Sequence, residues 1–138
     1  MDGWWLAPPE PTSLRMQDFK RLRVWQLAHE LRLEVRRVVS AWNGQPDYGL
    51  RSQLVRAASS IATNIAEGCG KRSPQELIRF GEIALASAKE VEDHLLEARD
   101  SGLLDARQFS ALNAKVLQVQ RMLGALIKTV RSRSSQLH

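Results

Sequence analysis

The stretch from Tyr48 to Gly68, YGLRSQLVRAASSIATNIAEG, constrains the fold more than any other part of the chain. At helical spacing it has one broad apolar face, made of Leu50, Leu54, Ala57, Ala58, Ile61, Ala62 and Ile65. The opposite face lacks the mixture of Lys and Glu that is typical of a surface helix. That face consists of Gln53, Arg56, Ser60, Asn64 and Glu67. Because short polar groups need protein partners once they are covered, we expect this helix to be the packing centre of a helical bundle.

Two helices are predicted in the first half of the chain. The first runs from about residue 18 to residue 41 or 42, with Asp18 as a candidate N-cap and apolar residues at steps of three and four. Asn43-Gly44 supplies the left-handed residue that would end it. The second covers about residues 50–67, and Gly68 is its expected C-cap.

Two more helices are predicted in the second half, and both have clear start signals. Ser73 is a capping residue, followed by proline at the first helical position and by Glu76 as the partner of a capping box. Gly102 ends this third helix. The fourth begins at Asp105, with Gln108 as its capping-box partner. Its apolar residues follow a strict three-four rhythm to Val130, which is typical of the shallow crossings in four-helix bundles.

The pattern as a whole predicts an all-α protein, an antiparallel up-down-up-down four-helix bundle. No segment has the alternation of a strand. Residues 1–17 contain three prolines and are predicted to be a short irregular N-terminal tail. The bundle is expected over residues 18–131, and residues 132–138 are expected to fray into a basic C-terminal tail.

The net charge of +5 is unevenly distributed along the chain. Residues 1–72 and 105–138 are basic, whereas residues 73–104, which include most of the third helix, are acidic. Segregation of this kind gives a bundle an acidic side and basic ends or faces, which suit an anionic partner. The candidates for phosphate contacts are Lys20, Arg21, Arg23, Arg32, Arg36, Arg37, Lys71, Arg72, Lys128, Arg131 and Arg133.

The sequence offers no catalytic constellation, and we expect no enzyme activity, no metal site and no cofactor. The single cysteine, Cys69, excludes an internal disulfide and has no activating base nearby. Glu90, His94 and Glu97 form one ladder on the acidic helix, which we interpret as a solvated face. No run approaches the roughly 20 apolar residues of a membrane span, and the N-terminus does not follow a signal-peptide pattern, so a cytoplasmic location is expected.

Three segments of this chain resemble a known family. They are Phe19–Ala28 (F-x-x-L-x-V-W-Q-x-A), Tyr48–Gly68 (YGL-x-SQ-x-x-RAA-x-SI-x-x-NIAEG) and Arg79–Glu90. The chain is similar over about residues 18–130 to the four-helix bundle proteins encoded in intervening sequences of bacterial 23S ribosomal RNA genes. The accessory variability proteins of diversity-generating retroelements belong to the same broad group. Two packing details differ, since the family usually has Phe-Pro ahead of YGL and Gly-Ser where this chain has Ala86-Ser87.

The resemblance implies a ring-shaped homopentamer without catalytic residues, nucleic-acid binding through a basic surface and, for the retroelement members, a reverse transcriptase as partner. The shared positions it points to are Arg56, Ser60, Asn64, Glu67, Ser87 and Glu90. Together with Gln53, we interpret them as a buried, hydrogen-bonded network that sets helix register. Within it we predict an ion pair between Arg56 and Glu90, since a buried charge needs a partner.

Two functions remain as alternatives from the sequence. The first is a non-catalytic oligomeric scaffold that binds RNA or DNA through backbone phosphates, where repetition of a basic patch would add avidity. The second is a protein-interaction adaptor, with the acidic third helix or the Trp4-Trp5 pair in the tail as its docking surface.

Overall fold

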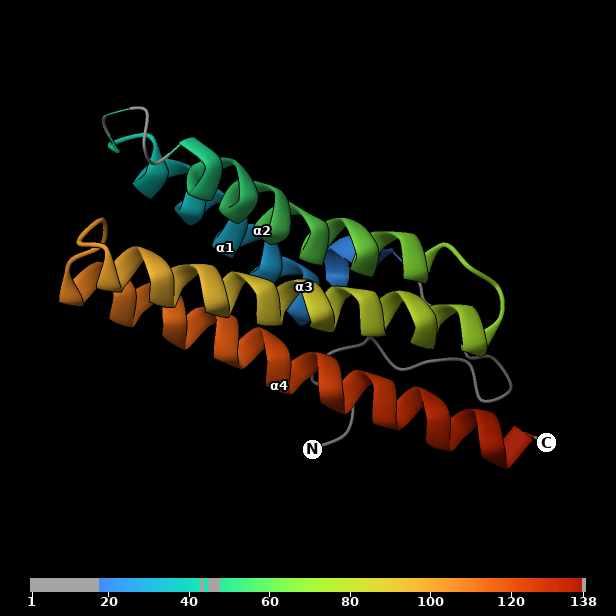
Figure 1. The fold of residues 1–138 in the computed structure, drawn as a ribbon. Helices are drawn as coiled ribbons and strands as arrows, with labels where there is room; N and C mark the ends of the chain where they lie inside the picture. The colour runs from blue at the N-terminus through green and yellow to red at the C-terminus, as the bar shows by residue number, and fades with distance from the viewer. Residues whose placement is uncertain (1–17, 43, 45–47, 138) are drawn as a thin grey trace.

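Four long helices make up the structure, a computed structural model that describes residues 18–42, 44 and 48–137 (Figure 1). The predicted tail over residues 1–17, with its Trp4-Trp5 pair, lies outside the described residues. A 3₁₀ turn, η1, precedes the first helix, and the elements are η1 (Phe19–Arg21), α1 (Arg23–Val39), α2 (Tyr48–Cys69), α3 (Pro74–Asp100) and α4 (Ala106–Leu137). The described residues contain no strand, so the predicted all-α class is confirmed.

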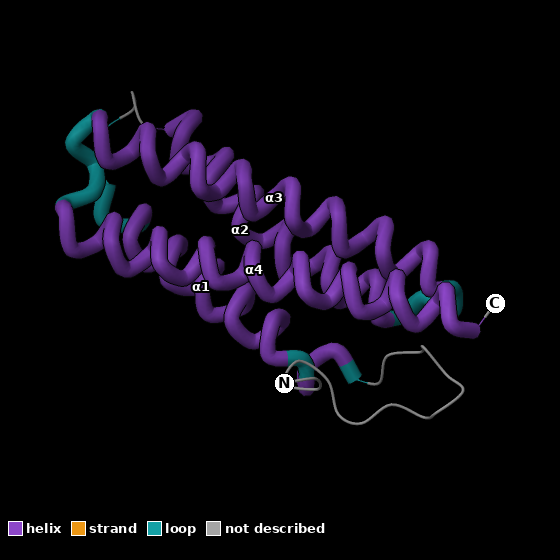
Figure 2. The backbone as a smooth tube through the Cα atoms, turned by 90° about the horizontal axis from the view of Figure 1, so that it is seen from below, coloured by secondary structure: helices purple, strands orange, loops and turns teal. Residues whose placement is uncertain are grey.

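The helices are arranged as a four-cornered bundle. α2 lies against α1 and α3, and α4 lies against α3 and α1, whereas no Cα atoms of the diagonal helix pairs come within 8 Å of each other. Successive helices run in alternate directions, as Figure 1 shows from the colour gradient. Figure 2 shows the connections gathered at the two ends of the bundle. The first turns of α3 lie beside the last turns of α4, where Glu82 pairs with Arg131. This arrangement determines which charged residues meet at each end.

The bundle core contains most of the predicted apolar residues. The whole apolar face of α2 is buried except Leu50, which is half-buried at the start of the helix. The facing stripe of α3 includes Ala84, Ser87 and Ala88, whose small side chains let α2 and α3 pack closely. On α4, the three-four seam from Leu112 to Val130 is buried. Burial of these stripes is the main favourable contribution to folding.

The predicted capping residues of α3 and α4 are confirmed. Ser73 Oγ accepts a hydrogen bond of 3.0 Å from the backbone N–H of Glu76, and Gly102 has the positive φ of 79° that ends α3. At the start of α4 the exchange is reciprocal. Asp105 accepts from the N–H of Gln108 at 2.7 Å, and the Gln108 side chain accepts from the N–H of Asp105 at 3.1 Å.

The first helix begins later than the periodicity predicts. Asp18 caps the 3₁₀ turn by accepting from the N–H of Lys20, and Leu22 is then extended before α1 starts at Arg23. Leu22 is only 1% exposed. The break turns this side chain into the core, and a periodicity argument cannot detect it because Leu22 fits the helical spacing equally well.

Three other helix ends also differ from the prediction. α1 ends at Val39, because the N–H groups of Ala41 and Trp42 bond three residues back and tighten the last turn. α2 continues to Cys69, so Gly68 is a helical residue and not a C-cap. The expected basic tail over 132–138 is wrong for residues 132–137, which extend α4, and Ser134 there is buried. No Gly or Pro after Val130 interrupts the helix.

Gly68 lies at a close contact between α2 and α3. A Cβ atom at this position would be 3.0 Å from Phe80 Cβ and 3.2 Å from Leu77 Cδ1. A Cβ at Gly124 on α4, by contrast, would meet nothing within 4 Å. These two helical glycines therefore occupy opposite packing environments.

We predict opposite effects of the same substitution at these two glycines. Gly68→Ala should lower the free energy of unfolding by roughly 1–3 kcal/mol, because Phe80 Cβ is held close to its own backbone and cannot yield. Gly124→Ala should raise it by about 0.5–1 kcal/mol, because alanine has the higher helix propensity. Urea denaturation of both variants measures the two changes, and a stabilised Gly68→Ala variant would contradict the packing described here.

Candidate nucleic-acid interface

Three segments that are distant in sequence meet at one end of the bundle. They are the start of the chain's helical part (residues 18–25), the α2–α3 turn with its flanking helix ends (66–83), and the last turns of α4 (124–135). Gly81 of α3 lies against Ile127 of α4. Asp18 is close enough to Cys69 for its charge to contribute to the raised pKa of the thiol. We call these three segments together the basic end.

The basic end contains an excess of cationic side chains. Its nine basic residues are Lys20, Arg21, Arg23, Lys71, Arg72, Arg79, Lys128, Arg131 and Arg133, and its acidic residues are Asp18, Glu67, Glu76 and Glu82. The difference equals the net charge of the whole chain, +5. Concentrated charge of one sign produces a local potential that attracts polyanions.

Most of the carboxylates at the basic end are already engaged by neighbouring cations. Lys20 pairs with Asp18 at 3.0 Å, Arg79 with Glu76 at 3.3 Å and Arg131 with Glu82 at 3.0 Å. The Lys20 backbone N–H also donates to Asp18, and this hydrogen bond lowers the pKa of that carboxyl. Within the described residues no ion pair forms at Arg23, Arg72, Lys128 or Arg133. These four cations have their charge available for a partner.

The structure brings together eight of the eleven cations proposed from the sequence. Arg32, Arg36 and Arg37 are not among them, because they lie further along α1 toward the other end. Arg32 is also engaged locally, since its Nε donates to His29 Nδ1 at 3.0 Å. Arg79 belongs to the basic end and was missed, because it lies on the helix with acidic composition. Because successive helices run in alternate directions, the start of the third helix lies at the same end of the bundle as the end of the fourth. That argument could have placed Arg79 at the basic end from the sequence.

An aromatic group that was also missed begins within the basic end, at Phe19 and Trp25, and continues to His29 of α1. Phe19 and Trp25 meet edge to face with ring centroids 5.1 Å apart, and Trp25 stacks on His29 at 4.8 Å. All three side chains are half-buried. Their spacing resembles that of core residues, so the sequence alone does not separate this group from the core.

The predicted polar network of α2 and α3 is much smaller than expected. Ser60 Oγ and Ser87 Oγ are 2.8 Å apart, and the Asn64 amide donates to the Ser60 hydroxyl at 3.0 Å. Asn64 also donates to the Ser60 carbonyl at 2.8 Å. Ser87 is buried, while Ser60 and Asn64 are half-buried. These three residues form the part of the network that links the helices.

The other members of that network are exposed in the single chain, so the expectation of a buried network is wrong for them. They are the neutral Gln53 and the charged residues Arg56, Glu67 and Glu90. Arg56 and Glu90 line one small cavity of about 130 Å³ between α2 and α3, together with Ala57 and Ser60. No ion pair joins Arg56 to Glu90 within 4.0 Å. On the helical wheel, Arg56 and Glu67 lie about a quarter of a turn beyond the buried edge, which accounts for their exposure.

The ladder of Glu90, His94 and Glu97 is only partly solvated, contrary to the sequence interpretation. Glu90 and Glu97 are exposed, but His94 is 9% exposed and lies one heptad after the buried Ser87. The nearest carboxylate oxygen is Glu90 Oε2, 3.7 Å from His94 Nε2. Within the described chain, no group of three or more His, Cys, Asp or Glu residues is arranged to hold a metal ion.

Cys69 is a free cysteine, buried at the end of α2. Its side chain is 7% exposed, and burial together with the charge of Asp18 raises the pKa of the thiol to about 12. The thiol is therefore protonated at neutral pH, which accords with a packing role. None of the described helices is long and apolar enough to cross a membrane.

Together, the fold and the charge distribution define a class of protein: a small helical bundle with one strongly basic end. A family model described as 23S rRNA-intervening sequence protein matches residues 20–125. The chain therefore belongs to the family of 23S rRNA-intervening sequence proteins, as the three sequence motifs indicated. A search among curated proteins gave no match.

A solved structure has the same fold. It is the crystal structure of a protein with unknown function from the S23 ribosomal protein family of Bacteroides thetaiotaomicron. The two chains are 23% identical, and the TM-score is 0.70. The match covers 76% of this chain and 98% of the other. At this identity the similarity concerns the fold alone.

Proposed function

We propose that this protein is a non-catalytic, oligomeric nucleic-acid-binding protein that holds RNA or DNA by its backbone phosphates at the basic end. The observation that supports this most is the convergence of nine basic residues from three distant segments, four of them with neither an ion pair nor an aromatic ring contact in the described chain. Arg and Lys side chains that neutralise phosphates release counterions and so supply sequence-independent affinity. The adaptor alternative has no comparable concentration of features in its favour among the described residues.

A charge-neutralising triple variant tests this proposal. Arg72→Gln, Lys128→Gln and Arg133→Gln together remove three cations from the basic end. The slope of log affinity against log salt should then become shallower by roughly 2–3, because each phosphate contact contributes about 0.7–0.9. Filter binding or fluorescence anisotropy between about 50 and 200 mM salt measures the slope.

The matched control removes three cations from the other end of the bundle. Arg36→Gln, Arg37→Gln and Arg107→Gln change the net charge of the chain by the same amount, and all three residues are exposed. We expect this control to change the slope by less than about 1, because no phosphate contact is lost. Equal effects of the two triple variants would contradict a localised interface, and a native chain that binds no nucleic acid at low salt would refute the function.

We also propose that copies of the chain assemble through the face that carries Arg56 and Glu90. These two residues of opposite charge line the small cavity between α2 and α3 without pairing to each other. Arg56 has no partner in the described residues of its own chain. A second copy that covers this face would supply the missing partners, and the family resemblance favours a ring of five.

Charge reversal at Arg56 tests the assembly. The native protein should have a solution mass of about five times the 15.6 kDa of one chain, measured by light scattering after size exclusion. Arg56→Glu should shift the mass toward that of one chain, because like charges directly opposite each other at an interface are destabilising. Arg121→Glu on the exposed side of α4 is the matched reversal and should leave the mass unchanged. An unchanged mass in Arg56→Glu would contradict the proposed face.

A further inference from the structure

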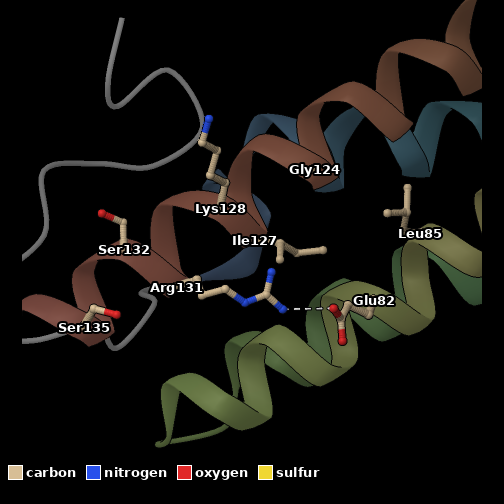
Figure 3. Close-up of a pocket in the computed structure, with 8 residues that line it drawn as sticks. All are labelled: Glu82, Leu85, Gly124, Ile127, Lys128, Arg131, Ser132 and Ser135. Atoms are coloured by element: carbon tan, nitrogen blue, oxygen red, sulfur yellow. Dashed lines mark hydrogen bonds and ion pairs between the residues drawn. The ribbon is translucent and has the colours of Figure 1, made fainter.

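The basic end contains a pocket between α3 and α4 (Figure 3). Its volume is about 460 Å³, within the range of roughly 300–1,000 Å³ found for small-molecule sites. Leu85 of α3 and Ile127 of α4 provide its apolar surface, and Lys128 and Arg131 provide its cations. The pocket thus combines apolar surface and positive charge within the span of two helical turns.

Gly124 leaves the space of this pocket open. It lines the pocket, and a Cβ atom at this position would meet nothing within 4 Å. A helical glycine usually costs stability relative to alanine, by roughly 0.5–1 kcal/mol. Gly81, the other glycine near the α3–α4 contact, is explained by packing because its Cβ would be 3.1 Å from Ile127. Packing does not explain why position 124 is a glycine. A ligand in the pocket would explain it, because a side chain at this position would occupy the same space.

The charges around the pocket favour an anionic group. Glu82 is its one carboxylate, and it is already bound to Arg131 at 3.0 Å, as the dashed line in Figure 3 shows. Lys128 has no ion pair with any described residue. Ser132 and Ser135 add two hydroxyl groups at the rim, which can donate to phosphate oxygens. The lining therefore suits a ligand with a negatively charged group and an apolar body.

We infer that this pocket holds one unpaired nucleotide of a bound strand, with its phosphate at Lys128 and its base against Leu85 and Ile127. This inference rests on the proposed nucleic-acid binding and specifies the substrate class as a single strand or a strand end. Only an unpaired base is free to enter, because a base inside a duplex must first lose its stacking and pairing. Single-strand binding proteins also combine a cationic groove with side chains that contact individual bases; there these side chains are mostly aromatic, and here they are aliphatic.

Filling the pocket without changing any charge tests the inference. Gly124→Leu places an apolar side chain into the open space, and leucine is a strong helix former, so the bundle should remain folded. Ala114→Leu is the matched control, because it adds apolar volume at an exposed position of the same helix that does not line the pocket. Fluorescence anisotropy then measures the affinity of each full-length variant for a labelled single-stranded oligonucleotide and for the blunt duplex of the same sequence.

We expect Gly124→Leu to weaken single-strand binding by roughly tenfold or more, as for loss of one base contact, while its salt slope stays that of the native chain. Ala114→Leu should bind like the native chain, and duplex binding should be the same in all three proteins. Single-strand affinity of Gly124→Leu within about twofold of native, or equal weakening for both nucleic acids, would overturn the pocket and leave the basic end intact. Absence of binding by the native chain would overturn both proposals.

Discussion

The close approach of α2 and α3 is the constraint on which the rest of the structure depends. Small residues on both helices, among them Gly68, Ala57, Ala84 and Ala88, let the two backbones pack tightly over most of their length. The hydrogen bond between Ser60 and Ser87 then links them at one register. Because a shift along either helix would break this bond and bring Gly68 out of contact with Phe80, the position of the α2–α3 turn is determined. That turn supplies Lys71 and Arg72 to the basic end. The packing of α2 against α3 therefore determines where these two cations lie.

The fold could be predicted from the sequence because its four apolar stripes are long and regular. Local rules also found the two best helix starts, at Ser73 and Asp105, since each capping side chain bonds to a backbone group only a few residues away. The errors concern ends that tertiary packing decides. Leu22 departs from helical geometry and its side chain is buried in the core. α4 continues past Val130 with Ser134 buried, and no residue pattern near Val130 predicts this continuation.

The candidate site could be predicted in part. Eight of the candidate cations lie at the basic end, but only the alternating directions of the helices place them there, together with Arg79 and without Arg36 and Arg37. The polar stripe of α2 was assigned to a buried network because its composition is unusual for a surface. Composition does not reveal whether a neighbouring helix or a second chain covers Arg56. The pocket beside Gly124 could not be predicted, because no pattern of residues in the sequence indicates where two packed helices leave a space between them.

Direct mapping of the contact on the protein tests the central claim, that three distant segments form one interface. A single-stranded oligonucleotide carrying photoreactive bases would be cross-linked to the native protein, and the modified peptides identified by mass spectrometry. The account predicts cross-links in all three segments of the basic end, residues 18–25, 66–83 and 124–135. Cross-links concentrated at the opposite end, over residues 36–42, 48–51 and 99–111, would contradict it.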